Sequence, residues 1–335
     1  MRSFFMGGIA ALAMTAATAA LANPVTLRMN NYEPPAGITN TEFYQPWVDR
    51  VNSIDPDALQ LQYFPGGGLG RDPTTQLEIV ESGVADMAYI LLPYHAGRFP
   101  DNLVMNFPFL GTSATEGSRA FTRLYQDGLL RGYDSIIPLG LQISPVSMLS
   151  SVEPINSIED LRGLRIRAAD GIWSRLIEAL GGVPVTNIPV NQAAENLSRG
   201  VIDASLDNWV IIGLFNHGEV APNAFAIPLG QVVTTVAMNR AVFDGLPEDA
   251  RAALEQASFM EYADMWGEAI DRLSDGIEQE WRENPDLNVV DYSEADRDAI
   301  IAARDTLMAR WFEEDPHHQV VFEALQAALA EERGE

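Results

Sequence analysis

Hydrophobic and polar positions predict strands and helices in turn over the first third of the chain. Apolar residues alternate with polar ones in two short stretches. In the segment after each of these stretches the apolar residues fall at three-to-four spacing, and the last stretch is almost continuously apolar. The predicted elements are a strand 25–31, a helix around 43–51, a strand 58–64, a helix 72–83 and a buried strand 84–92. This alternation is typical of a largely parallel sheet covered on both faces.

A second run of the same kind follows further along the chain. It predicts a strand 163–169, a helix 171–182, a strand 183–189, a helix 191–200 and a strand 201–209. Two α/β lobes in series are therefore expected. Residues 247–284 keep helical spacing throughout without an a/d heptad, which predicts one helix long enough to bridge both lobes.

The N-terminal residues have the pattern of a cleavable export signal. One positive charge at Arg2 precedes an apolar run from Phe4 to Met14, and Ala20 and Ala22 form a small-residue cleavage site. Residues 1–22 are thus expected to be removed, which leaves Asn23 as the first residue. The apolar run is shorter than the ~20 residues that a membrane anchor needs.

Composition narrows the possible partners. The 335 residues include no cysteine and carry a formal net charge of −26, so thiolate chemistry and thiolate metal sites are excluded. Such a surface repels nucleic acid and favours small molecules or a basic protein face. It also repels anionic ligands at long range, so a protein that binds acids would need a local basic site.

Several motifs of the kinds found in catalytic sites have simpler interpretations. Gly66–Gly68 lacks the spacing of a phosphate-binding loop and favours a sharp turn. His317 and His318 stand beside acidic residues, but adjacent histidines on a helix point apart, so a solvated terminal helix and no metal site are expected. His95 and His217 remain as candidate bases, and no G-x-S-x-G elbow accompanies them.

Three arginines in LRGLRIRAAD (161–170) are the strongest chemical signal. On a strand, Arg165 and Arg167 share one face, and Arg167 is the one at the carboxyl end, where open parallel sheets bind ligands. A guanidinium can hold a carboxylate through two parallel hydrogen bonds. Pattern alone leaves two readings open: Arg167 holds a ligand, or it forms a structural ion pair with Asp170.

The chain resembles the DctP-type solute-binding proteins of tripartite ATP-independent periplasmic (TRAP) transporters. The resemblance covers essentially all of the chain after residue 22. It is carried by PGGGLGRDPTTQLEIVESGVADMAY (65–89), GRFPDNLVMNFPFL (97–110), INSIEDLRGLRIRAAD (155–170), LGGVPVTNIPVNQAAENLSRGVIDASLDNW (180–209) and VAMNRAVFDGLPEDARAAL (236–254).

The resemblance implies a set of ligand contacts. Arg167 closes the L-x-G-L-x-I-R strand and would clamp the carboxylate of a bound acid. The other positions implied, or suggested by aromatic type, are Asn208, Asp170, Tyr94, Arg71, Val190, Trp173, Trp209 and Tyr32. Ser147 stands where some members place a second arginine, and Trp209 replaces a usual proline, which favours a more apolar pocket and a monocarboxylate. Each aromatic residue could equally belong to the core.

The expected fold class is α/β, a two-lobed periplasmic binding protein fold (type II-like) with a long helix across both lobes. Lobe I would comprise 23–144 and 233–272, and lobe II 145–232 and 273–335. The expected function is capture of an organic acid anion by hinge closure and delivery to a TRAP permease in the membrane, with no cofactor, no metal and no nucleic acid. An exported α/β enzyme and a sensory ligand-binding module are the alternatives.

Overall fold

The computed structural model describes residues 23–335, and the expected signal segment 1–22 lies outside the described residues. Within residues 23–335 the strands form two mixed sheets, one of five strands and one of six. Both consist of parallel strands with a single antiparallel strand inserted, β10 in the first sheet and β5 in the second. The prediction of two largely parallel α/β lobes is confirmed.

The first sheet has the strand order β2-β1-β3-β10-β4. Its strands are β1 Val25–Asn30, β2 Leu59–Phe64, β3 Met87–Leu91, β4 Ile136–Ile143 and β10 Val233–Asn239. Three helices precede β4 in the chain: α1 Gln45–Ile54, α2 Gln76–Glu81 and α3 Ala114–Gln126. Two more follow β10: α7 Arg240–Asp244 and α8 Glu248–Gln256. Every residue of β3 and β4 is buried, as expected for strands covered on both faces.

The second sheet has the order β11-β9-β5-β8-β6-β7. Its strands are β5 Met148–Ser151, β6 Arg165–Arg167, β7 Val183–Val185, β8 Ala204–Asp207, β9 Asn223–Phe225 and β11 Asn288–Val290. The helices among these strands are α4 Gly171–Ala179, α5 Ala193–Ser198 and α6 Trp209–Leu214. The chain crosses between the sheets at 144–147 and 226–232.

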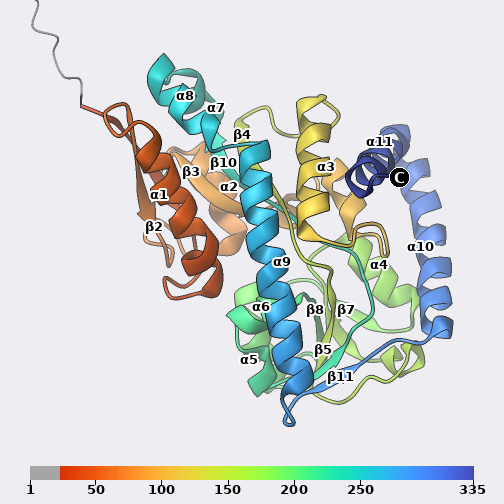
Figure 1. The fold of residues 1–335 in the computed structure, drawn as a ribbon. Helices are drawn as coiled ribbons and strands as arrows, with labels where there is room; N and C mark the ends of the chain where they lie inside the picture. Colours follow the sequence, from red (N-terminus) through yellow and green to blue (C-terminus); the bar gives the residue numbers. More distant parts are fainter. Residues whose placement is uncertain (1–22) are drawn as a thin grey trace, which may run out of the picture.

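The expected single helix over 247–284 is two helices, α8 and α9 Met260–Glu283. Phe259 has a φ of 57°, which a helix cannot contain, and its backbone N–H donates to the Leu139 carbonyl of β4. The 24 residues of α9 nevertheless run past both sheets (Figure 1). At Gly267 a Cβ would come within 2.4 Å of Thr115 Cα, so a glycine is needed where α9 crosses α3.

Two C-terminal helices, α10 Glu294–Glu314 and α11 Pro316–Arg333, pack on different lobes. α10 lies against α4 of the second lobe, while α11 lies against α3 of the first (Figure 1). The expected division assigned all of 273–335 to the second lobe. Ion pairs from Arg119 and Arg123 on α3 to Glu332 hold α11 in place.

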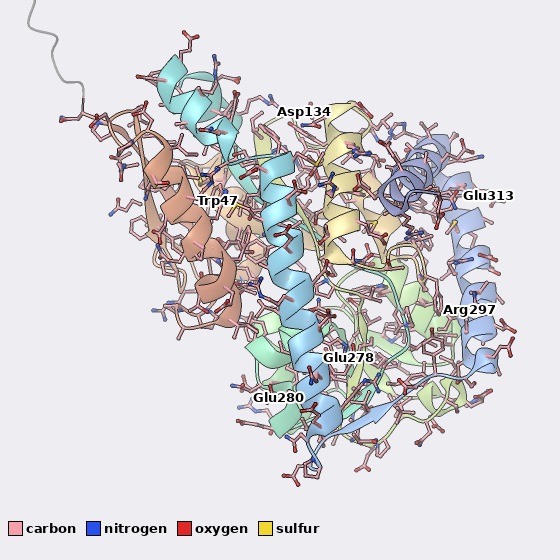
Figure 2. The ribbon with its side chains drawn as sticks, in the orientation of Figure 1. Trp47, Asp134, Glu278, Glu280, Arg297 and Glu313 are labelled. Atoms are coloured by element: carbon pink, nitrogen blue, oxygen red, sulfur yellow. The ribbon has the colours of Figure 1, made fainter. Side chains whose placement is uncertain are left out.

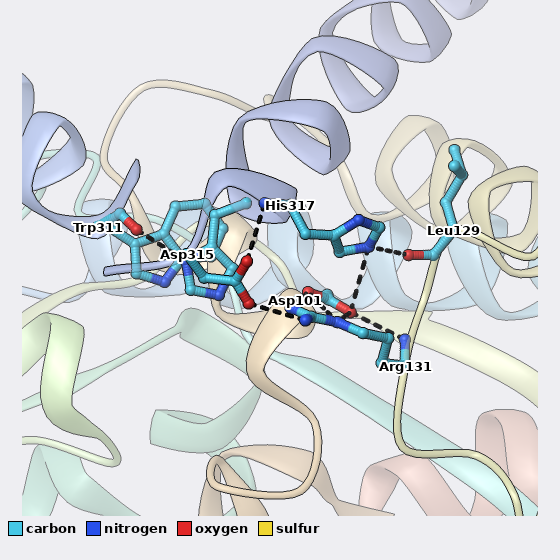
Figure 3. A network of polar contacts seen from close by, with 7 residues as sticks. Asp101, Leu129, Arg131, Trp311, Asp315 and His317 are labelled. Atoms are coloured by element: carbon cyan, nitrogen blue, oxygen red, sulfur yellow. Dashed lines mark hydrogen bonds and ion pairs between the residues drawn. The ribbon is translucent and has the colours of Figure 1, made fainter. Parts of the chain in front are cut away.

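The junction of α10 and α11 corrects the expectation of a solvated pair of histidines. His318 is 5% exposed and stacks on Trp311 with ring centroids 3.9 Å apart. The Nε2 atom of His317 lies 2.9 Å from the Leu129 carbonyl oxygen and 3.8 Å from buried Asp101, which pairs with Arg131 (Figure 3). These contacts fasten the junction to the first lobe.

The outside of the molecule is strongly charged. Glu280 on α9 and Glu313 on α10 are exposed, in contrast to Trp47 of α1, which is buried and donates its indole N–H to the Ala257 carbonyl (Figure 2). No helix within residues 23–335 combines the length and the apolar character that a membrane crossing requires.

Candidate functional site

A cavity of about 60 Å³ lies between the two sheets and is lined by residues of both. One water occupies about 10–15 Å³ on this measure, so the cavity has room for a small, compact molecule. The first lobe and the connection after β4 contribute Tyr89, Leu91, Pro93, Tyr94, Ser144 and Ser147, with Val232 and Thr234. The second lobe contributes Arg167, Ala169, Trp173, Val190, Leu206, Asp207, Asn208 and Ile211.

Arg167 at the end of β6 is the only cation among these lining residues, and it is 2% exposed. Its Nε donates to the Ile188 carbonyl at 2.9 Å and its Nη1 to Asp207 Oδ1 at 3.0 Å. Burial opposes the charge, but the Asp207 carboxylate together with the Tyr94 and Tyr32 side chains outweighs this effect and raises the pKa of Arg167. The arginine therefore stays charged at the cavity wall.

The hydrogen bonds of Arg167 leave part of its guanidinium available. A third contact, 3.4 Å from Nη2 to the Tyr94 hydroxyl, is long. Of its five N–H groups, two have no acceptor among the described residues. A carboxylate in the cavity can accept hydrogen bonds from these groups, while Ile188 and Asp207 fix the position of the guanidinium.

Two further polar side chains line the cavity with unused hydrogen-bonding capacity. Asn208 is the N-cap of α6 and accepts from the Ile211 N–H at 3.1 Å, whereas its amide nitrogen donates to no described residue. The hydroxyl of Ser147 is fully buried and has no partner among residues 23–335. Both groups can donate to an anionic or carbonyl oxygen.

The aromatic side chains of Tyr94 and Trp173 connect the two lobes around the cavity. The hydroxyl of Tyr94, on the 3₁₀ turn η3 (Leu92–His95), accepts from the Val190 N–H at 3.0 Å. The indole N–H of Trp173 lies 2.8 Å from the Leu229 carbonyl and 3.0 Å from the Asn106 carbonyl. These hydrogen bonds join the two lobes, which lie close together around the cavity.

The structure brings together five of the nine residues expected at the site. Those that line the cavity are Arg167, Asn208, Tyr94, Trp173 and Val190. Those that do not are Asp170, Trp209, Tyr32 and Arg71.

Asp170 is a helix cap and not the ion-pair partner of Arg167. Its Oδ1 accepts from the N–H groups of Ile172 and Trp173, which begin α4, and its Oδ2 accepts from Asn106 Nδ2 at 2.9 Å. Burial raises the pKa of Asp170 to about 6. The expected alternative pairing is thus replaced by the pair between Arg167 and Asp207.

The other three residues lie outside the cavity for different reasons. Trp209 packs on Trp281, with ring centroids 5.5 Å apart, and lines a separate open groove of about 640 Å³ beside α9. Tyr32 stacks on Tyr89 at 5.5 Å, one layer behind the cavity wall. Arg71 is exposed in the loop before α2.

Sequence reasoning missed Asp207 and the hydroxyl-bearing residues of the first lobe, Tyr89 and Thr234. Asp207 directly precedes Asn208 at the end of a strand, which was a usable signal. Tyr89 lies in an otherwise apolar strand, and Thr234 lies between Val233 and a second threonine; nothing in either pattern distinguishes the residue from its buried neighbours. No group of three His, Asp or Glu side chains within the described part of the chain is placed to hold a metal ion.

Comparison with known proteins gives one consistent family. The model of the bacterial extracellular solute-binding proteins of family 7 (DctP) matches residues 29–315. The outer membrane transporter protein TsaT of Comamonas testosteroni is 25% identical over 198 residues, which span 58% of each protein. The C4-dicarboxylate-binding periplasmic protein DctP of Rhodobacter capsulatus is 23% identical over 264 residues, 75% of each.

Solved structures show the same fold. A TRAP solute-binding protein of Rhodoferax ferrireducens, in complex with copurified benzoate, superposes with a TM-score of 0.85 at 22% identity, over 92% of this chain and 98% of that one. A TRAP periplasmic solute-binding protein of Bordetella bronchiseptica with bound mandelate has a TM-score of 0.82 at 21% identity, over 92% and 99%. Both confirm the two-lobed fold.

Proposed function

The chain belongs to the bacterial extracellular solute-binding proteins of family 7, and we propose that it is the solute receptor of a TRAP transporter that binds a small organic acid anion through Arg167. Members of this family are transport solute-binding proteins, so the protein binds its solute and does not convert it. The proposal for Arg167 rests on one observation: a buried, charged guanidinium at the cavity wall has N–H groups without an acceptor.

The composition of the cavity favours a monocarboxylate with an apolar or aromatic body. Arg167 is the sole cation among the lining residues, and Asp207 already balances its charge. Trp173, Leu91, Val190 and Ile211 supply apolar surface. A second carboxylate would lose its water without a matching partner. The benzoate and mandelate in the two similar structures support this choice, although DctP of Rhodobacter capsulatus binds C4-dicarboxylates.

Hinge closure is the proposed mechanism. Because residues of both lobes line the cavity, a ligand that contacts both stabilises the closed arrangement over an open one. Arg167 and Asn208 would hold the carboxylate on the second lobe, while Tyr89 and Thr234 would meet the body of the ligand from the first. Tyr94 would join the lobes at the rim of the site.

Delivery to the membrane subunits of a TRAP permease completes the proposal. A periplasmic location agrees with the family and with the signal pattern of residues 1–22. The strongly acidic surface, with a formal net charge of −26, would favour a basic face on the permease.

The test is identification of the bound acid. Protein purified without refolding is denatured, and the released small molecules are identified by mass spectrometry; a thermal-shift panel of organic acids then ranks affinities. We expect one acid to copurify unchanged and to raise the melting temperature. Absence of any stabilising acid, or conversion of the acid by the protein, would contradict the proposal.

A further inference from the structure

A buried histidine lies directly behind the pair formed by Arg167 and Asp207. His217 is on the short turn η7 (His217–Glu219) and is completely buried. Its Nδ1 atom lies 3.8 Å from Asp207 Oδ2 and 3.4 Å from Ser150 Oγ. Its Nε2 atom has no hydrogen-bond partner among the described residues. The imidazole therefore belongs to a polar chain that leads from the cavity wall into the second sheet.

The charges around His217 are few. Asp207 on β8 attracts a proton to it, and Arg167 on β6 opposes this, while β5 contributes only the hydroxyl of Ser150. Glu219 on the same turn is exposed. Burial lowers the pKa of His217, so the imidazole is neutral near pH 7 while the site is empty.

Binding of an acid changes this balance. In the empty site the charges of Arg167 and Asp207 cancel. A carboxylate bound at Arg167 leaves the buried group with one uncompensated negative charge, which is costly where water is excluded. The other residues that line the cavity carry no ionisable base. His217, in contact with the second oxygen of Asp207, is the adjacent group that can restore neutrality.

We propose that His217 takes up one proton when a carboxylate binds at Arg167, so that the protein captures the anion and a proton together. The inference rests on the proposed function, because it requires a carboxylate at Arg167. The only bond formed is an N–H bond: a proton from solvent is added to Nδ1 of His217, and the imidazolium faces Asp207.

The hydrogen bonds around His217 can adapt to both protonation states. The Ser150 hydroxyl lies 3.4 Å from His217 Nδ1 and 3.5 Å from the Ser205 carbonyl oxygen. It donates to Nδ1 when the imidazole is neutral and carries its proton on Nε2. Once Nδ1 is protonated, the hydroxyl turns to the Ser205 carbonyl. The surroundings of Nε2 are the same in both states.

Calorimetry of the intact protein tests the inference. Benzoate, or the copurified acid if benzoate does not bind, is titrated at pH 7 in phosphate and in Tris, whose ionisation enthalpies differ. The dependence of the heat on the buffer gives the number of protons exchanged. We expect uptake of about one proton per acid, and an affinity that increases by up to about tenfold per pH unit between pH 8 and pH 6.

Three variants distinguish proton uptake by His217 from proton uptake by other buried titratable groups. The His217→Asn variant should still bind the acid, but more weakly than wild type. Its binding should involve no proton uptake, and its affinity should not change between pH 8 and pH 6. Asp170→Asn and Glu33→Gln remove buried carboxyls whose pKa values lie at about 6 and about 7, and both variants should retain the uptake. Uptake that persists in His217→Asn would overturn the assignment.

Nuclear magnetic resonance provides a second measurement, in which the signal of His217 is the one missing from the His217→Asn variant. The chain has four histidines, and ¹⁵N labelling distinguishes neutral imidazole from imidazolium in each. One buried histidine should convert to imidazolium when the acid binds. Binding without proton exchange would contradict this inference and leave the proposed function intact, whereas absence of binding by both acids would contradict both.

Discussion

The hydroxyl of Tyr94 accepts a hydrogen bond from the backbone N–H of Val190 at 3.0 Å, and this bond joins the first lobe to the second at the rim of the cavity. The same hydroxyl lies 3.4 Å from Arg167 Nη2. One oxygen atom thus links the turn after β3 both to the backbone of the opposite lobe and to the proposed ligand contact.

Removal of this hydroxyl should weaken binding without disturbing the fold. Tyr94→Phe leaves the Val190 N–H without its acceptor in the closed arrangement, at a cost of about 1–2 kcal/mol, or roughly five- to thirtyfold in affinity. Isothermal calorimetry measures the change. Tyr292→Phe is the matched control and should bind normally, because Tyr292 packs on Phe109 and does not line the cavity. Equal affinity in the two variants would exclude a role for the Tyr94 hydroxyl in closure.

Replacement of Arg167 should nearly abolish binding. Arg167→Ala removes the charged contact of the carboxylate, which typically costs about 4 kcal/mol, or about three decades in affinity. Arg167→Lys should retain little of the affinity, because the lysine ammonium lacks the planar fork of a guanidinium. Arg165→Ala is the control, since Arg165 is on the same strand but its exposed side chain pairs with Asp203.

Arg167→Ala also leaves Asp207 buried without a partner, so lost binding could reflect unfolding. The double variant Arg167→Met with Asp207→Asn removes both charges and avoids this cost. It should remain folded by circular dichroism and still fail to bind. Binding of the acid within about threefold of wild type in this variant would refute the role of Arg167.

Monocarboxylates should bind more tightly than dicarboxylates of similar size. The reason is that the lining residues contribute a net charge of zero before any ligand enters. A thermal-shift panel that pairs each monocarboxylate with the corresponding dicarboxylate measures the preference. Because Arg71 is exposed and does not line the cavity, Arg71→Ala should leave the ranking unchanged. A consistent preference for dicarboxylates would show that the charge of the site is misassigned.

The stability of the fold should depend on the ionisation of Glu33. This side chain is 2% exposed and accepts from the Thr39 hydroxyl at 2.5 Å, and burial raises its pKa to about 7 from an ordinary value of 4.5. Between these two values the unfolded chain has lost the proton and the folded chain retains it, so stability decreases as pH increases and levels off above pH 7.

Glu33→Gln removes this dependence. Relative to wild type, the variant should gain roughly 3 kcal/mol at pH 8 and little at pH 4.5, as measured by urea unfolding. Glu42→Gln, at an exposed position nearby, serves as the control. A difference between Glu33→Gln and wild type that does not change with pH would show that Glu33 titrates normally.

The contact between Arg131 and Asp101 should be important for stability. Asp101 is completely buried and Arg131 is its ion-pair partner. Arg131→Ala leaves this carboxylate without its charged partner and should destabilise the protein by about 2–4 kcal/mol in thermal unfolding. Arg199→Ala, which breaks an exposed pair within one helix, should cost less than about 0.5 kcal/mol. Similar losses in both variants would mean that burial of Asp101 is unimportant.

Much of the fold could be predicted from local pattern, because short strands with alternating or continuous apolar residues are separated by amphipathic helices. The position of Arg167 at the carboxyl end of its strand was also predictable from the sequence. The interruption at Phe259 was not, since residues 247–284 keep helical spacing and a backbone contact to Leu139, distant in sequence, decides it.

The direction in which each side chain points was the least predictable feature of the site. Trp209 and Asn208 are neighbours, yet one packs on Trp281 and the other lines the cavity. Sequence pattern placed both at the end of one strand and could not tell which lobe surface each would meet. The pairing of Asp207 with Arg167 could not be predicted for a different reason: Arg167 lies 40 residues earlier in the chain.

The placement of α10 on the second lobe and α11 on the first has a mechanical consequence. Among residues 23–335, the lobes are connected at 144–147, at 226–232, by α9, and again at the junction of α10 and α11. Any motion of one lobe relative to the other has to deform all four connections together, whereas a single linker would leave the lobes free to move in many directions. The proposed opening would therefore have to bend α9 and the junction of α10 and α11 together with the two shorter crossings.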